Sequence, residues 1–434
     1  MSNIKKLELL APAGNENKLE TAFAYGADAV YLGIPDFSLR VRINDFNLKT
    51  LKKSIEYAHR IGKKAYVTIN IFAHNEHIKA LPKYLKYLNT IGPDALIISD
   101  PGIISLAKKH LPKTDIHLST QANCTNVESA RFWYKQGIKR VILGREVTLK
   151  EIKLIKKELP KLELEYFIHG AMCMAYSGRC FLSKMFVNRS ANLGDCAQPC
   201  RWELDTTKYL LKAQRHEDEL ELVEEQHGSY ILNSKDLNLI KHLRELVKAG
   251  ITSFKIEGRA KSSYYLATVC GCYRKALDMI EANISSAKYN AEANYLFKEL
   301  EDKLVHRGYT TGFLFNEKAD QNIKDAKNIS NWEYCGQILD VISNRDKGKT
   351  IHFKVHNTIK AGENLEIIAK NYDIIKIRAK YFLEVKKGIL QEEKILEAHG
   401  GGGAKILAIY ISNQELGSAE IFPQGVIRRK KNRK

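Results

Sequence analysis

The sequence predicts an α/β protein: a (β/α)8 barrel-like N-terminal domain that carries a cysteine-bearing insertion, followed by a small C-terminal β-barrel domain. Three observations support this fold class. Short β-rich runs alternate with helical segments, a cysteine cluster interrupts the alternation after Gly170, and the last part of the chain alternates apolar and polar residues between turn signals. The predicted units are a barrel over 1–320 with an insertion at 171–232, a β domain over 331–425 and a basic tail over 426–434.

Eight β-rich runs mark the expected barrel strands, in the order Leu7–Ala11, Ala29–Gly33, Lys64–Asn70, Ala95–Ser99, Asp115–Ser119, Arg140–Gly144, Glu163–Gly170 and Ser253–Gly258. Helical patterns separate the early runs at Asn17–Tyr25, Leu48–Ile61 and Ile78–Ile91, and a further helix is expected at Leu237–Ala249. Three helices are followed by glycine (Gly26, Gly62 and Gly250), which is typical of a helix C-terminus. Alternating strands and helices predict parallel βαβ units, and eight strands suit a closed barrel; a doubly wound open sheet is the alternative.

Composition limits the class of protein. The chain has 434 residues, of which 44% are hydrophobic, so a sizeable core is expected. No window approaches the roughly 18 uninterrupted apolar residues of a membrane span, and the first apolar run is too short for a signal peptide, so the sequence predicts a cytoplasmic protein without a membrane span. The net charge of +19 favours a polyanionic partner, with nucleic acid first and an anionic membrane surface second. A lysine-rich proteome is the alternative explanation.

Four of the eight cysteines follow the seventh strand in the pattern Cys-x6-Cys-x15-Cys-x3-Cys: Cys173, Cys180, Cys196 and Cys200. In a reducing compartment, clustered thiolates indicate a metal site, because these soft ligands select zinc or an iron–sulfur cluster. Structural zinc sites usually pair cysteines two to four residues apart on both sides, and here only the second pair fits. The spacing favours an iron–sulfur cluster over zinc, with unligated cysteines as a third alternative. The remaining cysteines (Cys124, Cys270, Cys272 and Cys335) are expected to be structural.

The stretch Glu165–Ser183 (EYFIHGAMCMAYSGRCFLS) resembles the signature of the collagenase-like peptidase family U32. Supporting motifs run along most of the chain: LLAPAGN (Leu9–Asn15), GADAVYLG (Gly26–Gly33), STQAN (Ser119–Asn123), LGREV (Leu143–Val147), NSKDL (Asn233–Leu237) and FKIEGRAKS (Phe254–Ser262). The resemblance covers roughly residues 5–320, and the β-rich end resembles the C-terminal domain of the family.

The resemblance implies hydroxylation rather than proteolysis. Several members are oxygen-independent hydroxylases that hold a four-iron four-sulfur cluster on four cysteines, and the GxCxxxCRW ending here resembles the branch that makes 5-hydroxyuridine at the wobble position of tRNA with prephenate as co-substrate. Carried over by position, Cys173, Cys180, Cys196 and Cys200 would be the ligands. We therefore expect a tRNA uridine hydroxylase that binds the anticodon loop. The alternatives are a peptidase, for which the sequence has neither a Ser/His/Asp set nor HExxH, and a hydroxylase of ribosomal RNA or ubiquinone precursors.

Barrel active sites lie at the carboxyl ends of the strands, so polar residues there are candidates for substrate binding. The main candidates are His169 after the seventh strand, Glu257 and Arg259 after the eighth, Arg145 after the sixth and Gln121 after the fifth. Further candidates are Arg40, Arg42, Asn70, His74, Asn75, Asn123 and Glu146, and Tyr176 could stack on a base. Together they offer cations and donors suited to a carboxylate or phosphate. For each residue alone, a salt bridge or a helix cap is the alternative.

Overall fold

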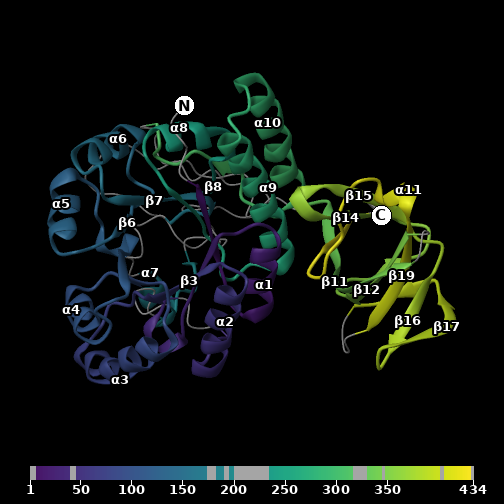
Figure 1. Ribbon diagram of the computed structural model, residues 1–434, viewed down its shortest axis with the longest axis horizontal. Helices are drawn as coiled ribbons and strands as arrows, with labels where there is room; N and C mark the ends of the chain where they lie inside the picture. The colour runs from purple at the N-terminus through teal and green to yellow at the C-terminus, as the bar shows by residue number, and fades with distance from the viewer. Residues whose placement is uncertain are drawn as a thin grey trace, which may run out of the picture.

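The computed structural model describes residues 6–39, 45–173, 182–189, 195–199, 234–315, 330–344, 348–400 and 405–431. Within these ranges the chain forms a parallel barrel surrounded by helices and, beside it, an antiparallel sheet (Figure 1). No helix among the described residues is both long and apolar enough to cross a membrane.

Eight parallel strands form the barrel: β1 (Glu8–Pro12), β2 (Ala29–Leu32), β3 (Lys64–Ile69), β4 (Ala95–Ile98), β5 (Asp115–Leu118), β6 (Arg140–Ile142), β7 (Glu163–Ala171) and β9 (Ser253–Ile256). Each strand pairs with the next, and β9 pairs in parallel with both β7 and β1. The last pairings close the sheet, which confirms the predicted barrel and excludes the open doubly wound alternative.

Helices cover the outside of the barrel: α1 (Glu16–Ala24), α2 (Leu48–Arg60), α3 (Asn75–Ile91), α4 (Pro101–His110), α5 (Val127–Lys135), α6 (Leu149–Glu158), α8 (Leu243–Lys248), α9 (Ser263–Glu281) and α10 (Ser286–Lys303). Polar side chains such as Asn47 and Thr148 cap their first turns. The three glycines predicted to end helices all have positive φ, between 69° and 94°, which only glycine adopts without strain.

The chain between β7 and α8 differs from the helix predicted at Leu237–Ala249. Asp236–Asn238 forms β8, which pairs antiparallel with the end of β7, and α8 begins only at Leu243. The Asn238 side chain explains this extended start, because its Oδ1 accepts hydrogen bonds from Tyr273 Oη (3.0 Å) and from the Ile240 amide (3.1 Å). A short strand, β10 (Tyr309–Thr310), pairs with β8. Most of the predicted insertion lies outside the described residues.

The C-terminal unit is an eight-stranded antiparallel sheet that curls as a half-barrel (Figure 1). Its strands, in spatial order, are β15 (Ile374–Arg378), β14 (Asn364–Ile368), β20 (Val426–Lys430), β11 (Trp332–Asn344), β12 (Gly348–Val355), β19 (Ile406–Ser412), β16 (Phe382–Lys386) and β17 (Ile389–Ile395). A two-stranded ribbon of β13 (Ile359–Lys360) and β18 (Glu397–Ala398) and a short helix, α11 (Asn413–Leu416), complete it.

The prediction of a basic tail over 426–434 is wrong for residues 426–430. These residues form β20, which lies between β14 and β11. Arg428 is fully buried there. Its guanidinium contacts Glu299 of α10 at 2.7 Å and Glu366 of β14 at 2.9 Å, so its charge is neutralised within the fold. Tyr25 ties the same strand to the barrel, because its hydroxyl accepts a hydrogen bond from the Val426 amide (2.9 Å) and donates one to the Ile368 carbonyl (2.7 Å). These buried bonds fix the sheet against the barrel.

Candidate active site

Tyr31 lies at the centre of a charged group at the mouth of the barrel, the end where the strands reach their carboxyl termini. Its hydroxyl donates to the Ile256 carbonyl (2.9 Å), and the Glu257 carboxylate lies 3.3 Å away. Lys255 Nζ and the guanidinium carbon of Arg259 lie 4.3 and 5.7 Å from the centre of its ring, where a cation is attracted to the aromatic face. Two predicted site residues, Glu257 and Arg259, therefore share one neighbour.

A second ring, Phe167, brings a third cation to this group. We call the two rings and the three cations near them, Lys255, Arg145 and Arg259, the floor of the mouth. The Arg145 guanidinium stacks on its ring at 3.9 Å, and Lys255 Nζ lies 5.6 Å from the ring centre. Arg145 comes from the loop after β6, Phe167 from β7 and Lys255 from β9, so three neighbouring loops and strands contribute. Lys255 thus lies near both rings; Phe167 also contacts Arg145, and Tyr31 also contacts Arg259.

The opposite side of the mouth carries polar amide and hydroxyl side chains. Asn70, after β3, donates from Nδ2 to Gln121 Oε1 (3.4 Å) and accepts from the Leu39 amide (3.2 Å). Ser119 also donates to Gln121. Gln121, a predicted site residue, is therefore positioned by β3 and β5 together.

His169 does not join this group, although it was predicted as a catalytic residue. Its ring lies among Tyr265, Tyr273 and Tyr309, with centroids 5.5 to 5.8 Å away, and its Nδ1 is 3.3 Å from Tyr273 Oη. Burial lowers the pKa of His169 to about 3. The imidazole is therefore neutral near pH 7 and a poor general base there.

The remaining candidates divide by location. Asn123 ends a short 3-10 helix with φ of 51°, which explains an asparagine there without any ligand. His74 and Asn75 are exposed at the start of α3. Arg40, Arg42 and Tyr176 lie outside the described residues.

A chain of buried ion pairs runs from the floor of the mouth down the inside of the barrel. Lys255 Nζ contacts Glu165 Oε1 at 2.6 Å, and Glu165 Oε2 lies 3.2 Å from Arg140 Nη1. The same Arg140 nitrogen contacts Glu8 at 2.5 Å. Positive and negative side chains alternate along this series of ion pairs. Each buried ion therefore has a partner of opposite charge, as the low polarity of the interior requires.

The pKa values of Glu8 and Lys255 are both lowered, for different reasons. Burial alone would raise the pKa of Glu8, but the charge of Arg140 and the hydrogen bonds from Arg140, Tyr66 and Ser253 together hold it below its ordinary value. Burial lowers the pKa of Lys255, and the attraction of Glu165 only partly opposes this. Lys255 therefore loses its proton more readily than an exposed lysine does.

Sequence reasoning missed Lys255, Glu165 and the two rings. The signal was available: in β9 the residues Ser253 and Lys255 alternate with the apolar Phe254 and Ile256, so the polar side chains point to one face of the strand. In a barrel strand that face is the interior, and an interior lysine needs a carboxylate partner.

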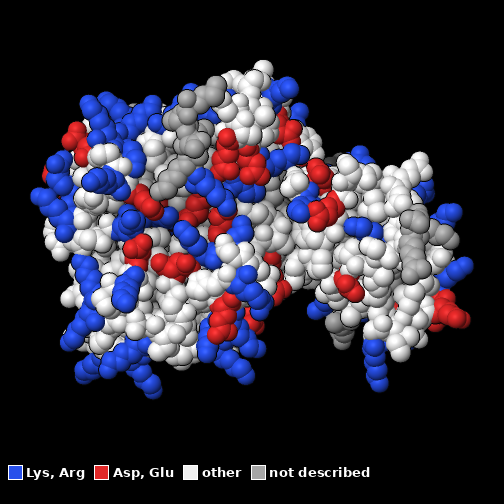
Figure 2. Space-filling view, viewed as in Figure 1, with Lys and Arg blue, Asp and Glu red and all other residues white. Residues whose placement is uncertain are grey.

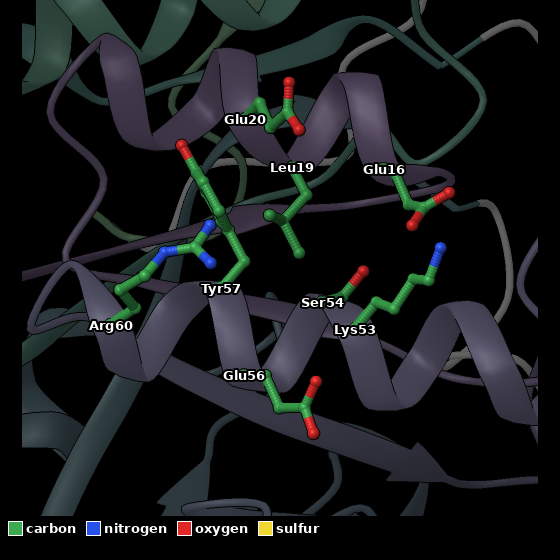
Figure 3. Close-up of a pocket in the computed structure, with 8 residues that line it drawn as sticks. All are labelled: Glu16, Leu19, Glu20, Lys53, Ser54, Glu56, Tyr57 and Arg60. Carbon is green, nitrogen blue, oxygen red and sulfur yellow. The ribbon is translucent and has the colours of Figure 1, made fainter.

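Two of the hollows away from the mouth carry charges of both signs. One, of about 340 Å³, opens at the amino-terminal ends of the strands among Lys64, Asp94, Asp115 and Glu163. The other, of about 260 Å³, lies between α1 and α2 on the outside of the barrel, where Glu16 and Lys53 point toward each other at one end and Tyr57 and Arg60 lie at the other (Figure 3). Both hollows are lined by carboxylates as well as cations, so neither favours the binding of a polyanion.

The cysteines divide by burial. Cys124, Cys270, Cys272 and Cys335 are buried, and burial raises the pKa of each thiol, to about 12 for Cys124 and Cys335. They stay protonated near pH 7, which fits the structural role predicted for them. Cys173 is exposed at the mouth directly after β7, and Cys196 is half-buried.

The two described cysteines of the predicted cluster suit thiolate ligands. Cys196 Sγ accepts a hydrogen bond from the Gln198 amide at 3.3 Å, the kind of bond that stabilises a charged sulfur. Ser183 accepts from the Ala197 amide (2.9 Å) and so holds residues 195–199 on α7 (Leu182–Val187). The other two, Cys180 and Cys200, lie outside the described residues, and no group of three possible metal ligands occurs within them.

Comparison with known proteins places the chain in a family. The chain is 41% identical over 406 residues to the tRNA hydroxylation protein P of Escherichia coli (strain K12), covering 85% of this chain and 87% of that protein. It is 32% identical to the 23S rRNA 5-hydroxycytidine C2501 synthase of the same organism, covering 86% of this chain and 54% of the synthase. It is 33% identical to a protein named Collagenase from Porphyromonas gingivalis, covering 73% of this chain and 75% of that protein. The family model described as Peptidase family U32 matches residues 14–324, and the chain belongs to that family.

Proposed function

We propose that this protein is an RNA hydroxylase that converts the wobble uridine of tRNA to 5-hydroxyuridine. The observation that carries the proposal is the similarity, over 85% of the chain, to proteins named for tRNA hydroxylation. A second relative, named for hydroxycytidine synthesis in 23S rRNA, supports RNA hydroxylation as the wider class of reaction. The wobble base lies in an exposed loop, so little unpairing is needed to bring it to a barrel mouth.

The mouth suits an anionic co-substrate. Lys255, Arg145 and Arg259 lie around the rings of Tyr31 and Phe167, and positively charged side chains of this kind bind carboxylate oxygens. Prephenate, the co-substrate expected from the family resemblance, carries two carboxylates and matches this floor. Gln121 and Asn70, on the opposite side, offer amide groups that can hydrogen-bond the edge of a uracil ring.

Cys173, Cys180, Cys196 and Cys200 would hold a four-iron four-sulfur cluster at the rim of the same mouth. Bound there, such a cluster supplies one-electron redox chemistry. The exposed Cys173 directly after β7 and the amide that points at Cys196 sulfur support this assignment. The Glu257 carboxylate, half-buried beside Tyr31, is the group of the mouth best placed to accept a proton from bound substrate.

The test is mass spectrometry of nucleosides from a strain whose gene for this protein is deleted. Loss of 5-hydroxyuridine and its derivatives from tRNA, with ribosomal 5-hydroxycytidine unchanged, is the expected result. Intact 5-hydroxyuridine in tRNA together with missing ribosomal hydroxycytidine would move the function to the other RNA.

Peptidase activity is a second candidate, because one relative is named Collagenase. Proteolysis needs an activated nucleophile or a metal-bound water, and the low pKa of His169 makes this histidine unsuited to activating a nucleophile. Gelatin cleavage by purified protein, abolished by Glu257→Gln, would favour this candidate over hydroxylation.

A further inference from the structure

We propose that a groove along α6 binds a single-stranded stretch of the RNA substrate and leads it to the barrel mouth. This inference rests on the proposed function, because it takes RNA as the substrate. The groove is a hollow of about 510 Å³ on the outside of the barrel. It is lined by Thr148, Leu149, Lys150, Lys153, Leu154, Lys157, Leu314 and Phe315.

The groove starts at the rim of the mouth. Thr148 caps the first turn of α6, three residues after Arg145, whose guanidinium stacks on the floor of the mouth. The Leu149 amide donates to the Leu314 carbonyl (2.8 Å), which holds Leu314 and Phe315 beside the same turn. An RNA strand bound in the groove would therefore pass directly from α6 to the candidate active site.

Its charge fits a phosphate backbone. Lys150, Lys153 and Lys157 are exposed and lie on one face of α6, spread over about 10 Å at 1.5 Å per residue. No carboxylate lines the groove among the residues that the structure describes. The nearby Glu151 turns to its own helix end, where it accepts hydrogen bonds from Thr148 at 2.7 and 2.8 Å. Lysine and arginine side chains also gather over α5 and α6 (Figure 2).

Exposed apolar side chains stand beside these lysines. Phe315 is 40% exposed and Leu154 51% exposed, although both are large hydrophobic residues. Phe315 is held by an edge-to-face contact with His242, whose ring centre is 4.9 Å away. Phosphate contacts next to an aromatic face on which a base can stack are typical of sites for single-stranded nucleic acid. A protein partner is disfavoured, because lysine is depleted in protein–protein interfaces.

Other lysine-bearing helices provide a matched control. Lys79, Lys83 and Lys86 of α3 are also exposed, and their replacement removes the same charge from a helix of the same barrel. We would compare K150Q/K153Q/K157Q with K79Q/K83Q/K86Q, using as the probe tRNA from a strain that lacks this gene. Each full-length protein is first checked for an unchanged unfolding midpoint.

The α6 triple variant is expected to bind this tRNA about tenfold more weakly or worse. The slope of log affinity against log salt should fall by about 2, since each phosphate contact on a single strand contributes about 0.7. The α3 variant should change affinity less than threefold. F315L should weaken binding without changing the salt slope, because stacking involves no counterion release.

The proposal that the groove binds RNA would be overturned if the two triple variants lost equal affinity for tRNA. It would also be overturned if the α6 variant bound tRNA as tightly as the wild type. A photoreactive phenylalanine at position 315 that crosslinks protein but no RNA in cells would also overturn it. The proposed function fails separately: if wild-type protein binds tRNA through α6 but the deletion strain keeps its 5-hydroxyuridine, the groove stands and the reaction does not.

Discussion

At the scale of single residues, His169 illustrates how burial decides a role. Its pKa of about 3 compares with about 6.5 for an exposed histidine. Between these two pH values, His169 is protonated in the unfolded chain but not in the folded protein. The free energy of unfolding therefore falls as the pH drops below about 6.5. His169→Gln should remove a stability loss of about 2 kcal/mol between pH 7 and pH 5.

Urea unfolding at the two pH values measures this effect. The same pH dependence in wild type and His169→Gln would contradict the lowered pKa, because it would show that His169 binds a proton as readily in the folded protein as in the unfolded chain.

Lys255 separates stability from function at the floor of the mouth. Lys255→Met leaves Glu165 with one cationic partner fewer in the interior and should destabilise the fold by about 3 kcal/mol. Adding Glu165→Gln removes the uncompensated charge and should recover most of that stability. If Lys255 only balances charge, the double variant would also recover hydroxylation; we expect hydroxylation to stay lost, measured as 5-hydroxyuridine in tRNA.

At the scale of elements, the predicted strands and helices were accurate where local sequence decides the structure. Apolar β-rich runs became β1 to β7, and glycines ended α1, α2 and α8 as expected. The predictions failed where distant residues decide. Residues 426–430 look like a solvated tail because Arg428 has no acidic neighbour in sequence, and its partners Glu299 and Glu366 lie 129 and 62 positions away.

The burial of Arg428 gives a prediction for strand β20. Arg428→Ala leaves two carboxylates with less compensation between α10 and the C-terminal sheet, and should cost about 3 to 5 kcal/mol. Lys430→Ala, two positions along the same strand at an exposed site, should cost less than about 0.5 kcal/mol. Thermal unfolding of the two variants gives the comparison; similar midpoints would contradict the structural role of Arg428.

At the scale of the whole molecule, the barrel mouth brings together residues that the sequence could only place at strand ends. Glu257, Arg259, Arg145 and Gln121 were predictable, because parallel strands in a barrel end on one face. The direction in which each side chain points was not predictable from the sequence. For this reason His169 was among the candidate site residues and Lys255 was not. The side-chain direction depends on helix α9 and strand β10, which supply the tyrosines around His169.

The proposed iron–sulfur cluster gives a prediction about iron content. Protein purified without oxygen should contain about four irons per chain, as a cubane on four thiolates requires. Cys173→Ala and Cys196→Ala should each lose most of this iron, whereas Cys335→Ala, which changes a buried thiol of the C-terminal sheet, should keep it. Stoichiometric zinc and no iron after anaerobic reconstitution would contradict the cluster.

We propose that this barrel mouth and its cysteines together hydroxylate tRNA. The most direct measurement is 5-hydroxyuridine in tRNA from the deletion strain, complemented either with the wild-type gene or with Cys173→Ala at equal protein level. We expect the wild-type gene to restore the nucleoside and Cys173→Ala to leave it absent. Full restoration by Cys173→Ala, or none by the wild-type gene, would contradict the proposal.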